Sequence, residues 1–115
     1  MKLSVVIPCF NEEKTIKEII DRVSKFKILE KEIIVVDDCS TDKSSEIIKA
    51  ISKNNHEIKA FFLEKNCGKG AALKRGFFES SGDIILIQDA DLEYDPTDYN
   101  ELIQPFLHTD ADVVY

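Results

Sequence analysis

Two aspartates separated by one small residue follow a run of four consecutive aliphatic residues. The run is 84–87, and after Gln88 come Asp89, Ala90 and Asp91. Such a run is typical of a strand buried on both faces. Because residues i and i+2 of an extended backbone point the same way, the two carboxylates are expected side by side. A hard divalent cation such as Mg²⁺ or Mn²⁺ would stabilise the pair and leave positions for phosphate oxygens. A solvated acidic turn fits the same residues.

Three other polar clusters also follow apolar runs: residues 8–12, the acidic pair Asp37–Asp38, and the glycine-rich loop 65–70. An aspartate after a strand can accept hydrogen bonds from a base edge or a ribose hydroxyl. The loop can offer N–H groups to a phosphate, with Lys69 as a point charge. The plainer alternatives are a helix-stabilising Glu12, a solvated acidic loop and a mobile surface turn. The loop lacks the spacing of a P-loop and of a G-x-G-x-x-G dinucleotide motif.

The elements that must position these clusters alternate along the chain. Apolar runs predict strands at 2–7, 33–36, 58–63 and 83–88, and the start of a fifth at 112–115. Helical spacing predicts helices between them, and a further helix begins at Pro96. Pro8 is expected to close the first strand, and Asn11 to cap the first helix, which runs to about Lys25.

This order predicts an α/β fold whose mostly parallel sheet has helices on both faces. The carboxyl ends of parallel strands line the ligand crevice of such a sheet. All four polar clusters follow strands, so they are expected at one edge. Their coincidence favours a site over four unrelated loops.

Composition sets further limits. A chain of 115 residues predicts one domain, 1–115, and the strand that starts at its end suggests truncation there. A net charge of −7 argues against a nucleic-acid partner. No apolar run approaches the ~18 residues of a membrane span, and the first residues lack the basic-then-apolar pattern of a signal peptide, so neither is expected in these 115 residues. Cys9, Cys39 and Cys67 lack paired metal-ligand spacing, which favours free thiols in a reducing compartment over a soft-metal site.

Four motifs together resemble the N-terminal, nucleotide-sugar-binding half of family 2 glycosyltransferases, which have the Rossmann-like GT-A fold. They are VVIPCFNEE at 5–13, VVDDCSTD at 35–42, NCGKGAA at 66–72 and QDAD at 88–91. The segment DADLEY at 89–94 is most similar to the polyprenyl-phosphate branch, the dolichyl- or undecaprenyl-phosphate mannosyl- and glucosyltransferases.

The resemblance implies roles for particular residues. Asp89 and Asp91 correspond to the D-x-D element that binds the divalent metal, Mg²⁺ or Mn²⁺, and Asp91 acts through that metal on the leaving group. Phe10 stands where many relatives have tyrosine, so it keeps a flat apolar surface without the hydroxyl. The implied nucleotide-sugar-binding residues are Pro8, Phe10, Glu12, Val36, Asp38, Lys69, Asp89 and Ala90.

The implied reaction is inverting transfer of a hexose from a GDP- or UDP-sugar to a polyprenyl phosphate. The family's general base lies beyond this sequence, but a phosphate monoester, with a second pKa of about 6, is already largely anionic and needs none. The 115 residues are expected to bind donor and metal with little turnover. The full-length protein is expected at the cytoplasmic face of a membrane, held by segments outside this sequence, and oligomers are possible.

Other functions fit parts of the pattern. One is a family 2 enzyme of the polysaccharide or cell-surface glycan branch. Another is a receiver-like signalling domain with an acidic Mg²⁺ pocket, although here the acidic pair follows the second strand and the later lysine is absent. A third is a binding module without catalysis.

Overall fold

The computed structural model describes residues 2–26, 30–90 and 113–114. A single five-stranded sheet forms, in the order β3-β2-β1-β4-β5, and every neighbouring pair of strands is parallel. The elements in chain order are β1 Lys2–Cys9, α1 Ile16–Lys25, β2 Glu30–Asp37, α2 Ser44–Lys53, β3 Ile58–Phe62, α3 Lys69–Glu79, β4 Ile84–Ile87 and β5 Val113–Val114. The predicted α/β architecture is confirmed. The helix expected from Pro96 falls outside the described residues.

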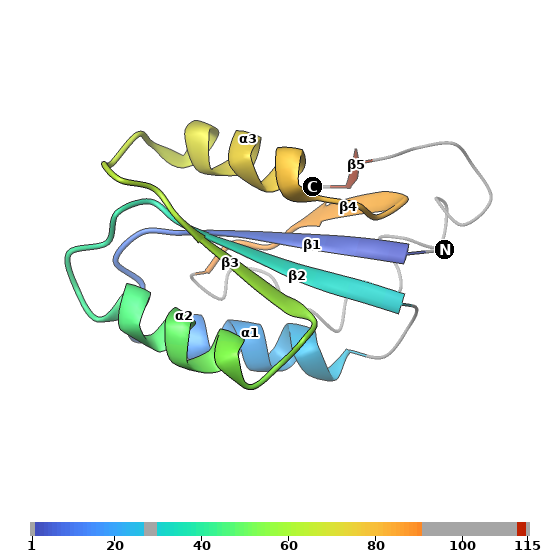
Figure 1. The fold of residues 1–115 in the computed structure, drawn as a ribbon, viewed down its shortest axis with the longest axis horizontal. Coiled ribbons are helices and arrows are strands. Elements are labelled where there is room, and N and C mark those ends of the chain that lie inside the picture. The colour runs from blue at the N-terminus through green and yellow to red at the C-terminus, as the bar shows by residue number, and fades with distance from the viewer. Residues whose placement is uncertain (1, 27–29, 91–112, 115) are drawn as a thin grey trace.

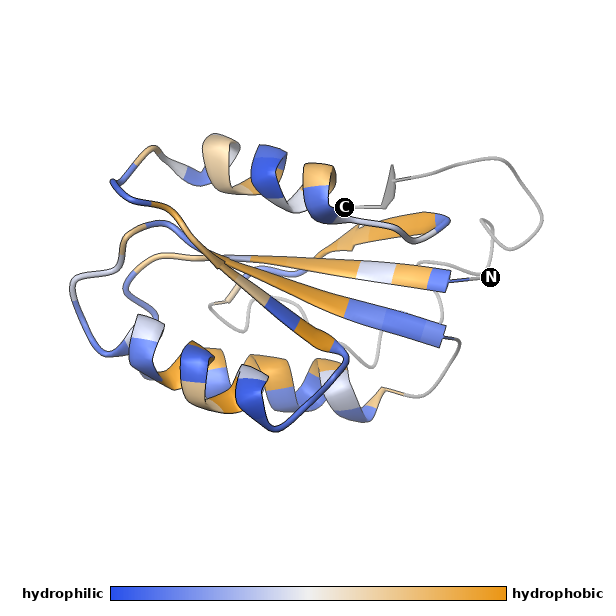
Figure 2. Cartoon of the chain, viewed as in Figure 1, coloured by the Kyte–Doolittle hydropathy of each residue, from blue (hydrophilic) through white to orange (hydrophobic). Residues whose placement is uncertain are grey.

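Helices cover both faces of the sheet. Figure 1 shows α1 and α2 on one face and α3 on the other. Figure 2 shows β1 and β4 as largely apolar and the start of β2 as hydrophilic, while each helix combines hydrophobic and hydrophilic residues. In α1, four apolar residues at helical spacing are fully or almost fully buried: Ile16, Ile19, Ile20 and Val23. This amphipathic stripe is what fixes α1 against the sheet.

The face under α3 has a smaller core. Its buried members are Val6, Ile34, Val36 and Ala72. Gly76 lets α3 approach β1 closely, because a Cβ at that position would collide with Val6 Cγ1. No helix within the described ranges is long and apolar enough to span a membrane.

Strand β4 is buried less evenly than its sequence predicts. Ile84 and Leu86 are buried in the larger core, whereas Ile85 and Ile87 are only half-buried. Successive side chains of a strand point to opposite faces, and α3 packs on β1 and β2 rather than on β4. Ile85 therefore reaches only the margin of the smaller core, which explains its partial exposure.

Pro8 does not end β1, contrary to the sequence-based expectation. It pairs with Val36 inside a central strand. Val6 O accepts a hydrogen bond from Gln88 N (3.0 Å), so Pro8, two residues on, turns its nitrogen towards the same neighbour, β4. Because β4 ends at Ile87, opposite Val6, the missing N–H of Pro8 costs no ladder hydrogen bond.

Asn11 is also used differently from the prediction that it caps the first helix. Its backbone is left-handed (φ 53°), and α1 begins only at Ile16, after a turn. The Asn11 side-chain oxygen accepts hydrogen bonds from Thr41 N (2.8 Å) and Asp42 N (3.2 Å). Asn11 therefore ties the loop after β1 to the loop after β2, which brings two of the predicted clusters together.

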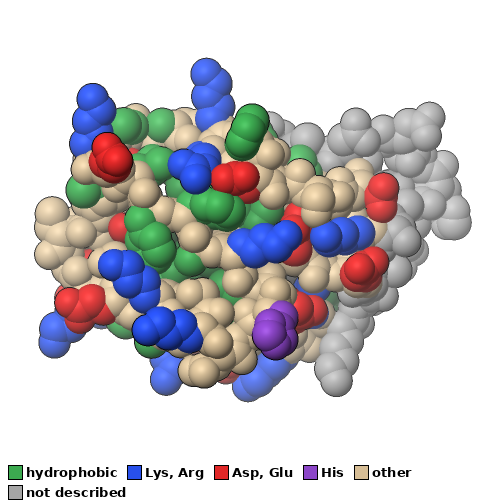
Figure 3. Space-filling model, in the orientation of Figure 1, with side chains coloured by type: hydrophobic (Ala, Val, Ile, Leu, Met, Phe, Trp, Pro, Cys, Tyr) green, Lys and Arg blue, Asp and Glu red, His purple; other side chains and the backbone are tan. Residues whose placement is uncertain are grey.

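Acidic and basic side chains are interspersed over the face seen in Figure 3, with hydrophobic side chains visible between them. Among the described large hydrophobic residues, Phe10 and Phe78 are exposed. Phe78 lies on α3, whereas Phe10 follows β1 at the carboxyl edge of the sheet.

Candidate functional site

The carboxyl ends of β1, β2 and β4 and the start of α3 surround a cavity of about 420 Å³. Its lining residues are Pro8, Cys9, Phe10, Glu12, Asp38, Asn66, Gly68, Lys69, Ala72, Asp89 and Ala90. They come from all four predicted polar clusters. The nucleotide-sugar-binding residues expected from the sequence all line this cavity, with the exception of Val36.

Val36 has no exposed surface and lies in the core under α3, where Ala72 packs beside it. Ala72 itself reaches the cavity wall. The structure therefore places Val36 behind the wall rather than on it.

Asp38 holds the glycine-rich loop in place. Its carboxylate is almost completely buried and accepts hydrogen bonds from Cys67 N (2.8 Å) and Gly68 N (2.9 Å). The loop can turn here because Gly68 has a φ of +93°, which favours glycine. The sequence allowed N–H groups of this loop to face a phosphate, but these two are already bound to Asp38. The N-terminus of α3, which begins at Lys69 beside the cavity, is the remaining backbone feature suited to an anion.

Lys69 is the one cation among the described residues that line the cavity, and it pairs with an acid. Its Nζ lies 2.5 Å from Asp89 Oδ1, and the lysine side chain stays 59% exposed. Glu12 and Asp38 add two more carboxylates to the lining. A diphosphate entering so acidic a cavity would need more positive charge than one lysine supplies, which favours a bound cation.

Phe10 supplies the apolar part of the cavity. It is 43% exposed, which is unusual for a large aromatic side chain beside a strand end. An aromatic face open to solvent in a cavity is suited to stacking against a nucleobase. Pro8, two residues before it, extends the apolar surface.

The donor atoms in the cavity fit a hard metal rather than a soft one. Cys9 lines the cavity, but burial, opposed only in part by a hydrogen bond with Ser44, raises the pKa of its thiol to about 12. The thiol is therefore neutral and a poor metal ligand. The carboxylate oxygens that remain are the ligands that Mg²⁺ and Mn²⁺ prefer.

Asp89 is the predicted metal ligand that the structure describes, and Asp91 lies outside the described residues. Cys39 is half-buried and Cys67 is exposed, and both are free thiols. Within residues 2–26, 30–90 and 113–114, no group of three His, Cys, Asp or Glu side chains is placed to hold a metal. The soft-metal cluster considered from the sequence is thus not formed there.

The sequence did not single out Cys9, Asn66, Gly68 or Ala72 as individual lining residues. Asn66 and Gly68 belong to the glycine-rich loop, so their motif carried the signal. Ala72 comes one helical turn after Gly68, where a small residue lets α3 pack closely on Val36. Cys9 stands between two predicted site residues, and its small side chain gave no signal of its own.

A model of the family described as "Glycosyl transferase family 2" matches residues 4–115, almost the whole chain. The chain belongs to glycosyltransferase family 2. The alternative of a receiver-like signalling domain is thereby set aside.

Proteins similar to this chain include an undecaprenyl-phosphate 4-deoxy-4-formamido-L-arabinose transferase from Photorhabdus laumondii. It is 39% identical over 107 residues, which cover 90% of this chain and 33% of that protein. The chain therefore spans about a third of the length of this curated relative.

Two solved structures are also similar. Staphylococcus aureus TarS 1-349 is 32% identical, with a TM-score of 0.76 and coverage of 91% of this chain and 33% of that one. Glucosyl-3-phosphoglycerate synthase from Mycobacterium tuberculosis, in complex with Mn²⁺ and UDP-glucose, is 30% identical, with a TM-score of 0.75 and coverage of 93% and 39%.

Proposed function

We propose that these 115 residues form the donor-binding part of an inverting glycosyltransferase that transfers a hexose from UDP-sugar to a polyprenyl phosphate. The observation that carries the proposal is the cavity at the carboxyl edge, which combines an exposed aromatic face, a lysine and an oxygen-rich acidic group. A nucleoside diphosphate has a matching base and phosphates, and a divalent cation would complete the charge balance.

Each part of the donor has a suited partner in the cavity. The base would stack on Phe10, with Asp38 at the inner wall to accept a hydrogen bond in addition to those from the loop. The diphosphate would lie towards Lys69 and the N-terminus of α3. Asp89, together with Asp91, would hold the cation.

The chemistry follows from charge development in the transition state. A divalent cation, when bound, stabilises the negative charge that forms on the departing diphosphate. Lys69 would add a second positive charge at the same place, after exchanging Asp89 for a phosphate oxygen. The identity of the nucleotide is proposed from the solved structure that holds UDP-glucose.

The acceptor is proposed from a relative whose name specifies undecaprenyl phosphate. A phosphate monoester acceptor is largely ionised at neutral pH, so it needs no general base from this part of the chain. Such an acceptor would place the full-length protein at a membrane surface.

Calorimetric titration tests donor binding directly. UDP and GDP are titrated into the 115-residue chain with and without Mn²⁺, and we expect UDP to bind more tightly when Mn²⁺ is present. Asp89→Asn should abolish most of the Mn²⁺-dependent gain, at least tenfold, because the cation loses a charged ligand. Asp21→Asn is the matched control, since Asp21 is an exposed acid on α1. Failure of both nucleotides to bind would refute the proposal.

The acceptor needs a separate experiment with the full-length protein. Membranes or micelles containing undecaprenyl phosphate are compared with the same preparation containing undecaprenol, and sugar transfer from labelled UDP-sugars is measured. Transfer to the phosphate alone is expected. Transfer to a polysaccharide primer but not to the lipid phosphate would favour the glycan-synthesis branch instead.

A further inference from the structure

The backbone of residues 89–90 is held at two consecutive carbonyl groups. Gln88 Nε2 donates a hydrogen bond to Asp89 O (3.1 Å), and the Thr15 hydroxyl donates one to Ala90 O. Gln88 is fully buried, and its own N–H makes the last hydrogen bond from β4 to β1. The backbone of residues 89–90 therefore leaves the sheet in a fixed direction.

Thr15 stands on a turn that is itself well anchored. Thr15 N and Ile16 N both donate hydrogen bonds to Glu12 O (3.1 and 2.9 Å), and Ile16 is fully buried. At the other end of the turn, Glu12 N donates to the Ser44 hydroxyl (2.9 Å), which lies at the start of α2. These hydrogen bonds fix the backbone of Thr15, and its hydroxyl is thereby held next to Ala90 O.

The hydroxyl has two acceptors within reach and one proton. Glu12 Oε2 is 3.4 Å away, while Ala90 O is much nearer, so the proton goes to Ala90. The contact joins residues 75 positions apart in the sequence. It links the loop after β1, which lines the cavity through Glu12, to the end of β4.

We propose that Thr15 is a positioning residue for Asp89, the metal ligand of the proposed function that the structure describes. By fixing the Ala90 carbonyl, it sets the orientation of the backbone at residues 89–90 and so keeps the Asp89 carboxylate at the cavity. This inference rests on the proposed function for its consequence, which is tighter metal-dependent nucleotide binding. A side chain with a purely structural role would change the stability of the fold. It would not weaken UDP binding in the presence of Mn²⁺ while leaving UDP binding without metal unchanged.

The first test uses two variants that differ by the hydroxyl. Thr15→Val keeps the shape of threonine and removes the donor, whereas Thr15→Ser keeps the donor. We expect Thr15→Val to reduce the Mn²⁺-dependent gain in UDP affinity by about three- to tenfold, the usual effect of one lost hydrogen bond. UDP affinity without metal should stay the same, and Thr15→Ser should restore the gain. Equal loss with and without Mn²⁺ would overturn the proposal.

The second test needs no ligand, so it separates this inference from the proposed function. Amide hydrogen exchange and amide chemical shifts of Asp89 and Ala90 are measured by NMR in the wild type, Thr15→Val and Thr15→Ser chains. We expect faster exchange and shifted resonances at these two residues in Thr15→Val only. The signals of Ser81 and Gly82 should stay unchanged, because these residues lie in the turn before β4, at the other end of that strand. Unchanged Asp89 and Ala90 signals would refute the positioning role even if UDP binds.

If the wild-type chain binds neither UDP nor Mn²⁺, the proposed function fails while the NMR comparison still decides whether Thr15 fixes the segment. If Thr15→Val does not fold, the milder Thr15→Ala and Thr15→Ser pair gives the same contrast. Altered Asp89 signals in Thr15→Ala with wild-type signals in Thr15→Ser support the proposal, and identical signals in both contradict it.

Discussion

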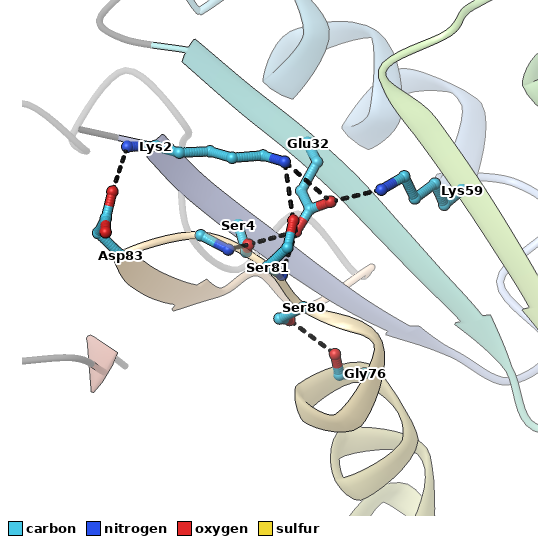
Figure 4. A network of polar contacts seen from close by, with 9 residues as sticks. Lys2, Ser4, Glu32, Lys59, Gly76, Ser80, Ser81 and Asp83 are labelled. Atoms are coloured by element: carbon cyan, nitrogen blue, oxygen red, sulfur yellow. Dashed lines mark hydrogen bonds and ion pairs between the residues drawn. The ribbon is translucent and has the colours of Figure 1, made fainter.

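The sheet has a buried carboxylate near the amino ends of its strands, called here the amino edge, and another at their carboxyl ends, the carboxyl edge. The two carboxylates have different surroundings. At the amino edge, Glu32 of β2 is only 3% exposed and is enclosed by hydrogen-bond donors (Figure 4). The donors are Ser4 Oγ (2.6 Å), Lys59 Nζ (2.8 Å), Ser81 N (2.6 Å) and Ser81 Oγ (3.0 Å). At the carboxyl edge, Asp38 is equally buried, yet it borders an open cavity.

The difference separates stability from binding. Burial by itself raises the pKa of Glu32, but the hydrogen bonds from Lys59, Ser4 and Ser81 outweigh it and lower the pKa to about 2. Its charged carboxylate therefore holds β1, β2, β3 and the turn before β4 together. The carboxylates of the other edge are arranged around space that a ligand can fill, so changes there should alter affinity first.

Removing Glu32 should have the largest effect on stability. Glu32→Ala leaves Lys59, Ser4 and Ser81 without their shared acceptor, and we expect the free energy of unfolding to fall by about 3 kcal/mol. Chemical denaturation measures this, and Glu18→Ala, which removes an exposed ion pair with Arg22 on α1, is the control with an expected change below about 1 kcal/mol. UDP affinity of folded Glu32→Ala should match the wild type. Reduced affinity would mean that the two edges are not independent.

The pH dependence of stability should show the same carboxylate. The pKa of Glu32 is lower in the folded state, at about 2, than its ordinary value of 4.5. Its contribution is therefore complete above pH 4.5 and is lost as pH falls from 4.5 towards 2, by a total of about 3 kcal/mol. Denaturation curves of the wild type and Glu32→Gln should converge over this range. A gap of constant size would contradict the assignment.

Asp38→Asn should affect both stability and binding, because Asp38 lies at the cavity and also holds the loop. An asparagine can accept through one atom only and would present an N–H group to the loop, so we expect a loss of about 1–2 kcal/mol in unfolding free energy. UDP affinity should fall by about tenfold or more. Ser81→Ala is the comparison at the other edge, with lower stability and unchanged affinity. Wild-type UDP affinity in Asp38→Asn would remove Asp38 from the site.

Lys69→Met should have the smallest effect on binding, and it should change the affinities for Mn²⁺ and for UDP in opposite directions. Without the ammonium group beside Asp89, Mn²⁺ alone should bind a few-fold more tightly, since it no longer competes with the lysine. UDP should bind a few-fold more weakly, because a positive charge near the diphosphate is lost. Titrations of each ligand separately reveal the signs. Lys74→Met, on the exposed side of α3, is the control.

Much of this arrangement could be predicted from particular residues. The stripe of α1 and the aliphatic runs of the strands gave the parallel sheet, since periodicity and burial are local properties of the sequence. The polar clusters after those strands predicted which residues line the cavity, because they follow parallel strands that end on the same side of the sheet. The predictions that Pro8 ends the first strand and that Asn11 caps the first helix were wrong. Their roles depend on where a neighbouring strand ends and on which loop lies alongside.

The enclosed Glu32 cluster was not predicted at all. Its donors come from strands and turns far apart in the chain, and no spacing rule connects Ser4 with Ser81. The contact of Thr15 with Ala90 was missed for the same reason. Long-range hydrogen bonds become visible only once the topology has placed the edges.

One measurement tests the contrast between the edges most directly: amide NMR of the wild-type chain during titration with UDP and Mg²⁺. We expect progressive shifts at Cys67, Gly68 and Asp89 of the carboxyl edge and unchanged signals at Ser81 and Gly82 of the amino edge. Absence of shifts at the carboxyl edge, or shifts confined to Ser81 and Gly82, would contradict the assignment of the cavity as the donor site.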